Sequence, residues 1–206
     1  AVTGVQTCAL PIYSGGGIMI EELALTDTLH MKFSQIMQEQ VLGPLGMTDS
    51  TYEQPLRGNW EIRAAHAHDA NGQPFDAPWH VYPEQAAAGL WTTPTDLAKF
   101  AIEIQLSMLG RSNKILNQKY TEEMVSPAGV GPFGEGFEVA QHGQGWYFSH
   151  TGSNWGFQCA LIAHRVKGYG VVIMTNGDNG GDLADEIIAR VAMAYHWDSL
   201  DKPILR

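Results

Sequence analysis

The sequence predicts an α+β fold, in which helices and loops come first and a mostly antiparallel sheet with a closing helix follows. Helical spacing and long loops occupy residues 13–128, and short strand-like segments separated by glycine-rich turns come next. A final helical segment completes the pattern. We therefore expect one partial domain over residues 13–202, with the sheet and its closing helix at 129–202.

Two helices are expected first. Residues 18–25 form an apolar segment after a run of glycines and should pack on several sides. Residues 31–42 show the spacing of an amphipathic helix. Gly43 and Pro44 should end this helix and begin a turn that runs to residue 52. Its apolar stripe consists of Phe33, Ile36, Met37 and Val41.

Residues 53–86 are rich in loops, with a hairpin turn expected at 69–74. A clear helix start follows. Thr93 can cap the helix, Pro94 suits its first position, and Asp96 favours the positive end of its dipole. The apolar stripe and the terminating glycine of this helix are Leu97, Phe100, Ala101, Ile104, Met108 and Gly110.

A shorter helix, capped by Asn117 and ending near residue 125, should precede the sheet. The expected strands are residues 135–141, 146–150, 155–164 and 169–175. The short connection at 166–168 predicts an antiparallel hairpin, whose last strand is apolar on both faces, as in a central strand covered by helices. A loop then leads to Asp182, which is expected to cap a closing helix at 183–197.

The composition excludes several classes of function. A formal net charge of −10 argues against a nucleic-acid partner, because a phosphate backbone needs a basic face. No apolar run is long enough to predict a membrane span. Cys8 and Cys159 are too few for a disulfide framework, so the cellular compartment stays open, and Cys159 is expected to be a small buried apolar residue.

The first twelve residues are interpreted as foreign to the natural protein. Residues 2–12, VTGVQTCALPI, correspond to the translation of a common short-read sequencing adapter, and a meaningful pattern begins directly afterwards at Tyr13. A signal peptide is the alternative, but the segment lacks a basic start and an apolar core of sufficient length. Residues 1–12 are therefore excluded from the expected fold, together with Cys8.

Two short motifs carry the functional signal. Tyr13-Ser14-Gly15 stands at the head of a helix, and His150-Thr151-Gly152-Ser153 leaves one strand and turns into the next. The pair resembles the second and third active-site motifs of the penicillin-binding and class C β-lactamase-related serine hydrolases. The supporting segments are IMQEQVLGPLGMTDSTY at 36–52, AAAGLWTTPTDLAKF at 86–100, HTGSNWGFQC at 150–159 and GYGVVIMTNGDNGG at 168–181. The resemblance covers residues 13–197.

The resemblance implies acyl transfer through a covalent serine ester, which requires an activated serine and a site that stabilises the oxyanion. Tyr13 would be the proton-transfer residue; the alternative is a core tyrosine beside a glycine-rich bend. Gly15 would contact substrate, but it stands where the family often has asparagine. An amide donor to the substrate carbonyl is therefore missing, which weakens a β-lactamase interpretation.

The strand motif would supply the other half of the site. Thr151 and Gly152 would bind substrate, with Gly152 allowing close backbone approach, and the N–H of Ser153 would be an oxyanion donor. His150 replaces the lysine of many relatives and, being mostly neutral at pH 7, should attract a substrate carboxylate weakly. The alternative for His150 is a solvent-facing edge residue. Trp155 is a candidate for the substrate groove, although aromatic residues also fill cores.

The nucleophile motif of the family, Ser-x-x-Lys, occurs once, at Ser199–Lys202. This match follows the closing helix and precedes Pro203, whereas the motif needs the first turn of a buried helix. No Gly-x-Ser-x-Gly elbow is present. We therefore expect the serine and lysine to lie upstream of Tyr13 and the chain as written to be inactive.

The expected function is a serine hydrolase acting on small ester, amide or D-amino-acid peptide substrates. The alternatives are a true β-lactamase or D-Ala-D-Ala carboxypeptidase, and a catalytically dead binding protein of the same fold. No metal or other cofactor is expected, since His66, His68 and Asp69 lack the rest of a metallo-hydrolase pattern and residues 176–182 lack calcium-ligand spacing. Oligomeric state stays open, and a periplasmic or secreted location is compatible with the family.

Overall fold

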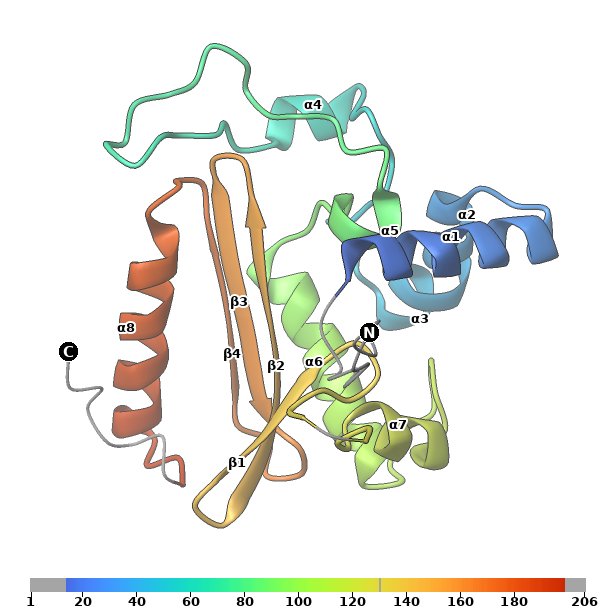
Figure 1. Cartoon of the computed structure of the whole chain (residues 1–206), viewed down its shortest axis with the longest axis vertical. Helices are drawn as coiled ribbons and strands as arrows, with labels where there is room; N and C mark the ends of the chain where they lie inside the picture. The colour runs from blue at the N-terminus through green and yellow to red at the C-terminus, as the bar shows by residue number, and fades with distance from the viewer. Residues whose placement is uncertain (1–13, 130, 199–206) are drawn as a thin grey trace, which may run out of the picture.

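The computed structural model describes residues 14–129 and 131–198, and it confirms the α+β fold (Figure 1). The predictions for residues 1–12, Tyr13 and Ser199–Lys202 lie outside the described residues. The strands are β1 (Glu138–His142), β2 (Gly145–Asn154), β3 (Phe157–His164) and β4 (Gly170–Thr175). They form one antiparallel sheet in the order β1-β2-β3-β4, so the hairpin predicted between the last two strands is confirmed.

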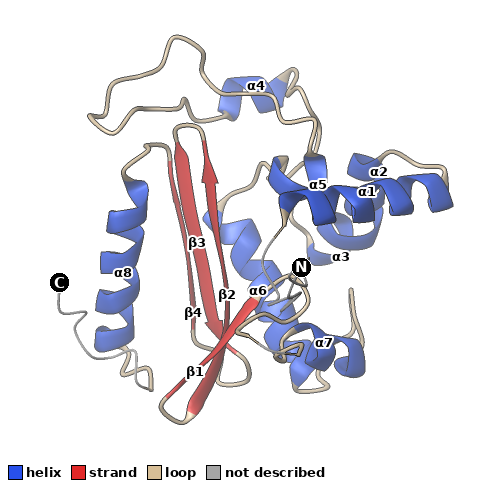
Figure 2. Ribbon diagram, viewed as in Figure 1, coloured by secondary structure: helices blue, strands red, loops and turns tan. Residues whose placement is uncertain are grey.

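Helices cover both faces of the sheet (Figure 2). The helix α6 (Pro94–Met108) packs on one face, where Ala101 and Ile104 join Phe148 and Leu161 in the largest buried cluster. The helix α8 (Gly180–Ala194) packs on the other, where its Ala184 and Ala192 contact residues of the strands. The other helices are α1 (Gly15–Leu29), α2 (Phe33–Met37), η1 (Gln38–Leu42), α3 (Gly43–Leu45), α4 (Asn59–Arg63), α5 (Gln85–Ala88) and α7 (Gln118–Met124).

The start of α6 and the hairpin turn agree with the sequence analysis. The Thr93 hydroxyl accepts the N–H of Asp96, and Pro94 is the first helical residue. In the turn at 69–74, the carboxylate of Asp69 accepts the N–H groups of Asn71 and Gln73, each at 2.8 Å. Such Asx hydrogen bonds stabilise a turn without help from neighbouring elements, which is why local sequence was sufficient to predict it.

The first helices differ from the prediction. Helix α1 begins at Gly15 rather than residue 18, because the Ser14 hydroxyl accepts the N–H of Gly17 and caps it. The second helix does not end at Gly43. Its last turn, η1, widens to a π-helix in which Gly43 N–H bonds to the Gln38 carbonyl. The wider turn accommodates the ring of Pro44, which would clash in a regular helix, so the chain stays helical to Leu45.

Three boundaries in the sheet region also need correction. Strand β1 begins at Glu138, three residues later than predicted, and β2 continues to Asn154, so the His150 motif lies inside a strand. Helix α8 begins at Gly180 with Asn179 at its N-cap position, and Asp182 lies in its first turn instead of capping it. No helix in the described ranges 14–129 and 131–198 has the length and apolar character of a membrane span.

Candidate active site

The second half of β2 has an open edge. Pairing between β1 and β2 ends at Glu138 and Ser149, whereas pairing between β2 and β3 continues to Asn154 and Phe157. Residues 150–154 therefore pair with β3 on one side, and no other strand among the described residues pairs with them on the other. This stretch, called the open edge below, contains the whole His150–Ser153 motif.

Backbone groups of Thr151 and Ser153 face the open edge. The N–H of Arg165 donates to the carbonyl of Trp146 at 2.9 Å, which identifies the hydrogen-bonded pairs between β2 and β3. Because such pairs alternate in an antiparallel ladder, the even-numbered residues of β2 bond to β3 and the odd-numbered ones point the other way. Unpaired N–H and C=O groups of this kind are a template for an extended ligand.

The side chains of the motif alternate between the two faces of the sheet. Phe148 packs toward α6, so His150 and Gly152 lie on that face, while Thr151 and Ser153 lie on the α8 face. The Ser153 hydroxyl accepts a hydrogen bond from the Gln158 amide at 2.9 Å. What Ser153 offers at the open edge is therefore its backbone N–H, which is the group that the oxyanion role needs. His150 is exposed.

The sheet leaves no room for a side chain at Gly152. It pairs with Cys159 on β3, and a Cβ added to Gly152 would lie only 2.6 Å from the Cys159 Sγ atom. The strand motif predicts a role for this glycine in substrate approach, and the sheet itself also requires it. Cys159 is partly buried rather than buried, and burial raises the pKa of its thiol. It is therefore a packing residue with little thiolate near neutral pH.

Two hydrogen bonds fix the helical region against the open edge. The carboxylate of Glu22 in α1 accepts the N–H of Ala86 at 2.8 Å, and the amide of Asn154 donates to the carbonyl of Ala88 at 3.0 Å. Helix α5 is thereby held between α1 and the end of β2. Sequence analysis missed both polar residues; Asn154 directly follows the strand motif, but no local signal identifies Glu22.

The first motif stands on this framework. Tyr13 lies outside the described residues, so its predicted role stays a prediction. Ser14 caps α1, and Gly15 is its first residue, placed beside Ala87 of α5. The structure therefore places Gly15 close to the helix that Asn154 binds, so that α5 lies between the two sequence motifs. The substrate contacts predicted for Gly15, Thr151 and Gly152 remain predictions.

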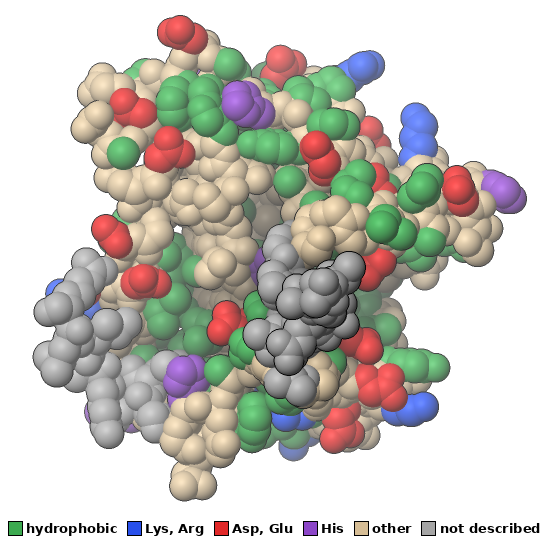
Figure 3. Space-filling model, viewed as in Figure 1, with side chains coloured by type: hydrophobic (Ala, Val, Ile, Leu, Met, Phe, Trp, Pro, Cys, Tyr) green, Lys and Arg blue, Asp and Glu red, His purple; other side chains and the backbone are tan. Residues whose placement is uncertain are grey.

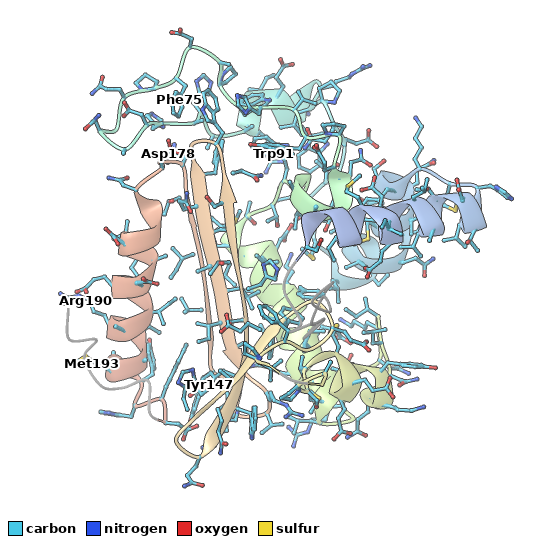
Figure 4. All side chains as sticks on the ribbon, in the orientation of Figure 1. Phe75, Trp91, Tyr147, Asp178, Arg190 and Met193 are labelled. Atoms are coloured by element: carbon cyan, nitrogen blue, oxygen red, sulfur yellow. The ribbon has the colours of Figure 1, made fainter. Side chains whose placement is uncertain are left out.

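Trp155 is enclosed by aromatic rings at the tip of the β2–β3 hairpin. Its ring centroid lies 3.8 Å from Phe75 and 4.0 Å from His80, with interplanar angles of 24° and 4°. Two rings this close must occupy opposite faces of the indole. Figure 4 places Phe75 and Trp91 in the loops above this end of the sheet, near Asp178. In this structure Trp155 anchors a loop; its contact with substrate stays a prediction.

The hairpin tip is also bonded through its backbone. Gly156, whose φ of +73° suits a glycine, donates its N–H to the Asp178 carboxylate at 2.7 Å, and Trp155 donates to the Tyr82 hydroxyl at 3.1 Å. These contacts hold one end of the open edge rigidly between two loops.

The histidines of the 64–70 segment have structural partners. His68 Nδ1 lies 3.0 Å from the Asn176 carbonyl, and His66 packs edge-on against Trp79. The backbone N–H of Gln73 is the main cause that lowers the pKa of Asp69. Within the part of the chain that the structure describes, no three His, Cys, Asp or Glu side chains are grouped to hold a metal ion.

Comparison with protein families and solved structures shows which known proteins the chain resembles. Residues 11–195 match the model of the β-lactamase family. The structure is similar to that of SurE, with a TM-score of 0.73 and 21% identity over 89% of this chain and 45% of that one. It is similar to a D-amino acid amidase from Ochrobactrum anthropi SV3 complexed with D-phenylalanine, with a TM-score of 0.67 and 21% identity over 91% and 59%.

A third similar structure is the octameric penicillin-binding protein homologue from Pyrococcus abyssi, with a TM-score of 0.70 and 19% identity over 91% of this chain and 43% of that one. The chain thus spans about half the length of these proteins. No curated protein sequence matches it significantly. The family model nevertheless matches most of the chain and includes both sequence motifs, and the solved structures share its sheet and flanking helices. The chain belongs to the β-lactamase family.

Proposed function

We propose that the chain is part of a serine hydrolase that forms an acyl-enzyme on ester, amide or D-amino-acid peptide substrates. The observation that carries this proposal is the open edge of β2, whose Ser153 N–H points away from β3 in a strand that is hydrogen-bonded to α5 and, through α5, to α1. Membership of the β-lactamase family and the fold shared with a D-amino acid amidase support it.

Three residues of the two motifs have a direct role in this proposal. The Ser153 N–H donates to the oxyanion that forms when the serine attacks the substrate carbonyl. Tyr13 moves the proton from the attacking serine to the leaving group. The open edge binds the substrate backbone through Thr151. The hydrogen bonds of Asn154 and Glu22 to α5 keep the two motifs at a fixed spacing.

The chain as written lacks the nucleophile and is inactive in this proposal. Its sole Ser-x-x-Lys match, at Ser199, follows α8 and lies outside the described residues. The test is to incubate the chain with a fluorophosphonate probe and a fluorescent penicillin and to map any label by mass spectrometry. We expect no labelled serine, and covalent labelling of any serine in this chain would contradict the proposal.

The substrate class is tested on a longer protein that continues upstream of Tyr13. We expect Ser-x-x-Lys there, and turnover of a chromogenic ester or amide that exceeds turnover of a chromogenic cephalosporin. Turnover of the cephalosporin alone would favour the β-lactamase alternative. A natural upstream sequence without Ser-x-x-Lys would favour a binding protein that has lost catalysis.

A further inference from the structure

We infer that the site accepts an acyl donor that carries a positive charge and no carboxylate. The inference rests on the proposed function, and it comes from the distribution of charge around the open edge rather than from the catalytic motifs. Three features of the chain point to it: the placement of its lysines and arginines, the carboxylates next to the edge, and the hydrogen bonds that occupy the ammonium group of α6.

The segments that border the open edge contain no lysine or arginine. The sequence lacks both residues over 15–31, 64–98, 120–164 and 168–189, which include α1, α5, the loop above the sheet and all four strands apart from their connections. On the face seen in Figure 3, the Lys and Arg side chains lie at the rim of the molecule. A substrate carboxylate at the edge would meet no cationic side chain from these segments.

Carboxylates, by contrast, adjoin both ends and one flank of the open edge. Glu138 is opposite Ser149, where the edge begins, and the Asp178 carboxylate accepts the N–H of Gly156 just beyond its end. Glu22 bonds to α5, which the edge residue Asn154 also binds. Strand spacing puts Ser149, opposite Glu138, about 13 Å from Ser153, and Gly156, three residues beyond Ser153, within about 10 Å of it.

The ammonium group of α6, the helix that packs on the His150 face of the sheet, already has hydrogen-bond partners. Lys99 Nζ donates to the Asp96 carboxylate at 2.7 Å and to the Gly46 carbonyl at 2.6 Å. Its charge is balanced by the buried carboxylate of Asp96, so it contributes little to the potential at the open edge. The strand motif carries His150 where many relatives have lysine, so the motif itself supplies no ammonium group at the open edge.

The size of the effect follows from Coulomb's law. One carboxylate about 10 Å away in water changes the binding constant of a unit charge about twofold before screening. The two carboxylates at the ends of the edge, at about 10 and 13 Å, should favour a monocation over a monoanion about fivefold at 10 mM salt and about twofold at 0.15 M, because the Debye length falls from about 30 to 8 Å. A dependence on salt of this size is therefore part of the inference.

The test measures how tightly the full chain binds two amides and one acid, all derived from D-phenylalanine. N-trimethyl-D-phenylalaninamide is a fixed cation, N-acetyl-D-phenylalaninamide is neutral, and N-acetyl-D-phenylalanine is an anion. Binding is followed at pH 7.5 by the NMR shifts of the Thr151 and Ser153 amides, at 10 mM and 0.15 M salt. We expect the order cation, neutral, anion, with the difference shrinking at the higher salt concentration.

A matched pair of variants isolates the charge near the site. Glu138→Gln should lower the preference for the cation over the anion about twofold at 10 mM salt. Asp185→Asn removes the same charge from an exposed position on α8 and should leave the preference unchanged. Equal effects of the two variants would mean that net charge, not the edge carboxylates, sets the order.

The other outcomes distinguish a failure of this inference from a failure of the hydrolase proposal. Tighter binding of the anion, or an order that salt does not change, would overturn this inference while leaving the hydrolase proposal intact. Absence of any shift at Thr151 and Ser153 with all three ligands would overturn the inference and remove the open edge as the substrate site. Labelling of a serine in this chain, by contrast, bears only on the proposed absence of the nucleophile.

Discussion

The tight contact between Gly152 and Cys159 yields a prediction that concerns the candidate site directly. In Gly152→Ala, the new Cβ would lie 2.6 Å from the Cys159 Sγ atom, whereas unstrained carbon contacts are about 3.5–4 Å long. The sulfur must rotate or the two strands must separate. Overpacking of this kind costs about 1–3 kcal/mol, so we expect that loss in the free energy of unfolding measured by urea denaturation.

A double-mutant cycle supplies the control. Cys159→Ala removes the sulfur, and Gly152→Ala in that background creates an alanine pair of ordinary size across β2 and β3. We expect the second substitution to cost less than about 0.5 kcal/mol there, so that the coupling energy is about 1–2 kcal/mol. If Gly152→Ala is equally destabilising with and without the sulfur, the contact is not the reason for the glycine. Close substrate approach or backbone freedom would then be the better explanation.

Three further predictions concern the buried polar groups and the strand motif. Asp96→Ala removes the carboxylate that accepts hydrogen bonds from the Asp49 N–H, the Ser50 hydroxyl and the ammonium of Lys99, so urea denaturation should show a loss of about 3 kcal/mol, and Ser50→Ala a smaller loss. Burial lowers the pKa of His164, and its Nδ1 atom accepts two backbone N–H groups. Since the unfolded chain then binds a proton more readily, stability should fall as pH drops below about 6.5, and His164→Gln should reduce that slope between pH 6.5 and 5.5. In a longer protein with the nucleophile, His150→Lys should raise kcat/KM for a carboxylate-bearing cephalosporin about tenfold, because a charge-assisted hydrogen bond is worth about 1.5 kcal/mol; an unchanged ratio to ester turnover would argue against the role given to His150.

The elements that could be predicted from sequence are those with local causes. The cap at Thr93, the Asp69 turn and the β3–β4 hairpin each depend on residues that are close together in the chain, and the structure confirms all three. The boundaries that were predicted wrongly lack such local causes. The π-helical turn before Pro44 and the start of α8 at Gly180 depend on fine backbone geometry that apolar spacing does not determine.

The open edge could not have been derived from the sequence. It exists because β1 begins at Glu138 and pairs with β2 only as far as Ser149, and that register depends on packing against α6. The contact of Glu22 with Ala86 likewise spans 64 residues of sequence. The motif at His150 therefore identified where the chemistry lies, while the directions of its N–H groups and side chains required the pairing of three strands.

Helix α5 explains how the two motifs keep their spacing. It is only four residues long, so its N–H groups at the start and C=O groups at the end have no partners within the helix. The Glu22 carboxylate satisfies a donor at one end and the Asn154 amide an acceptor at the other. Three alanines between these contacts allow α1 and β2 to approach closely. Because both bonds use backbone groups of α5, the spacing between the head of α1 and the open edge depends on the length of this helix and on two polar side chains. Substrate preference can then change through His150 and the surrounding charges without moving the oxyanion donor.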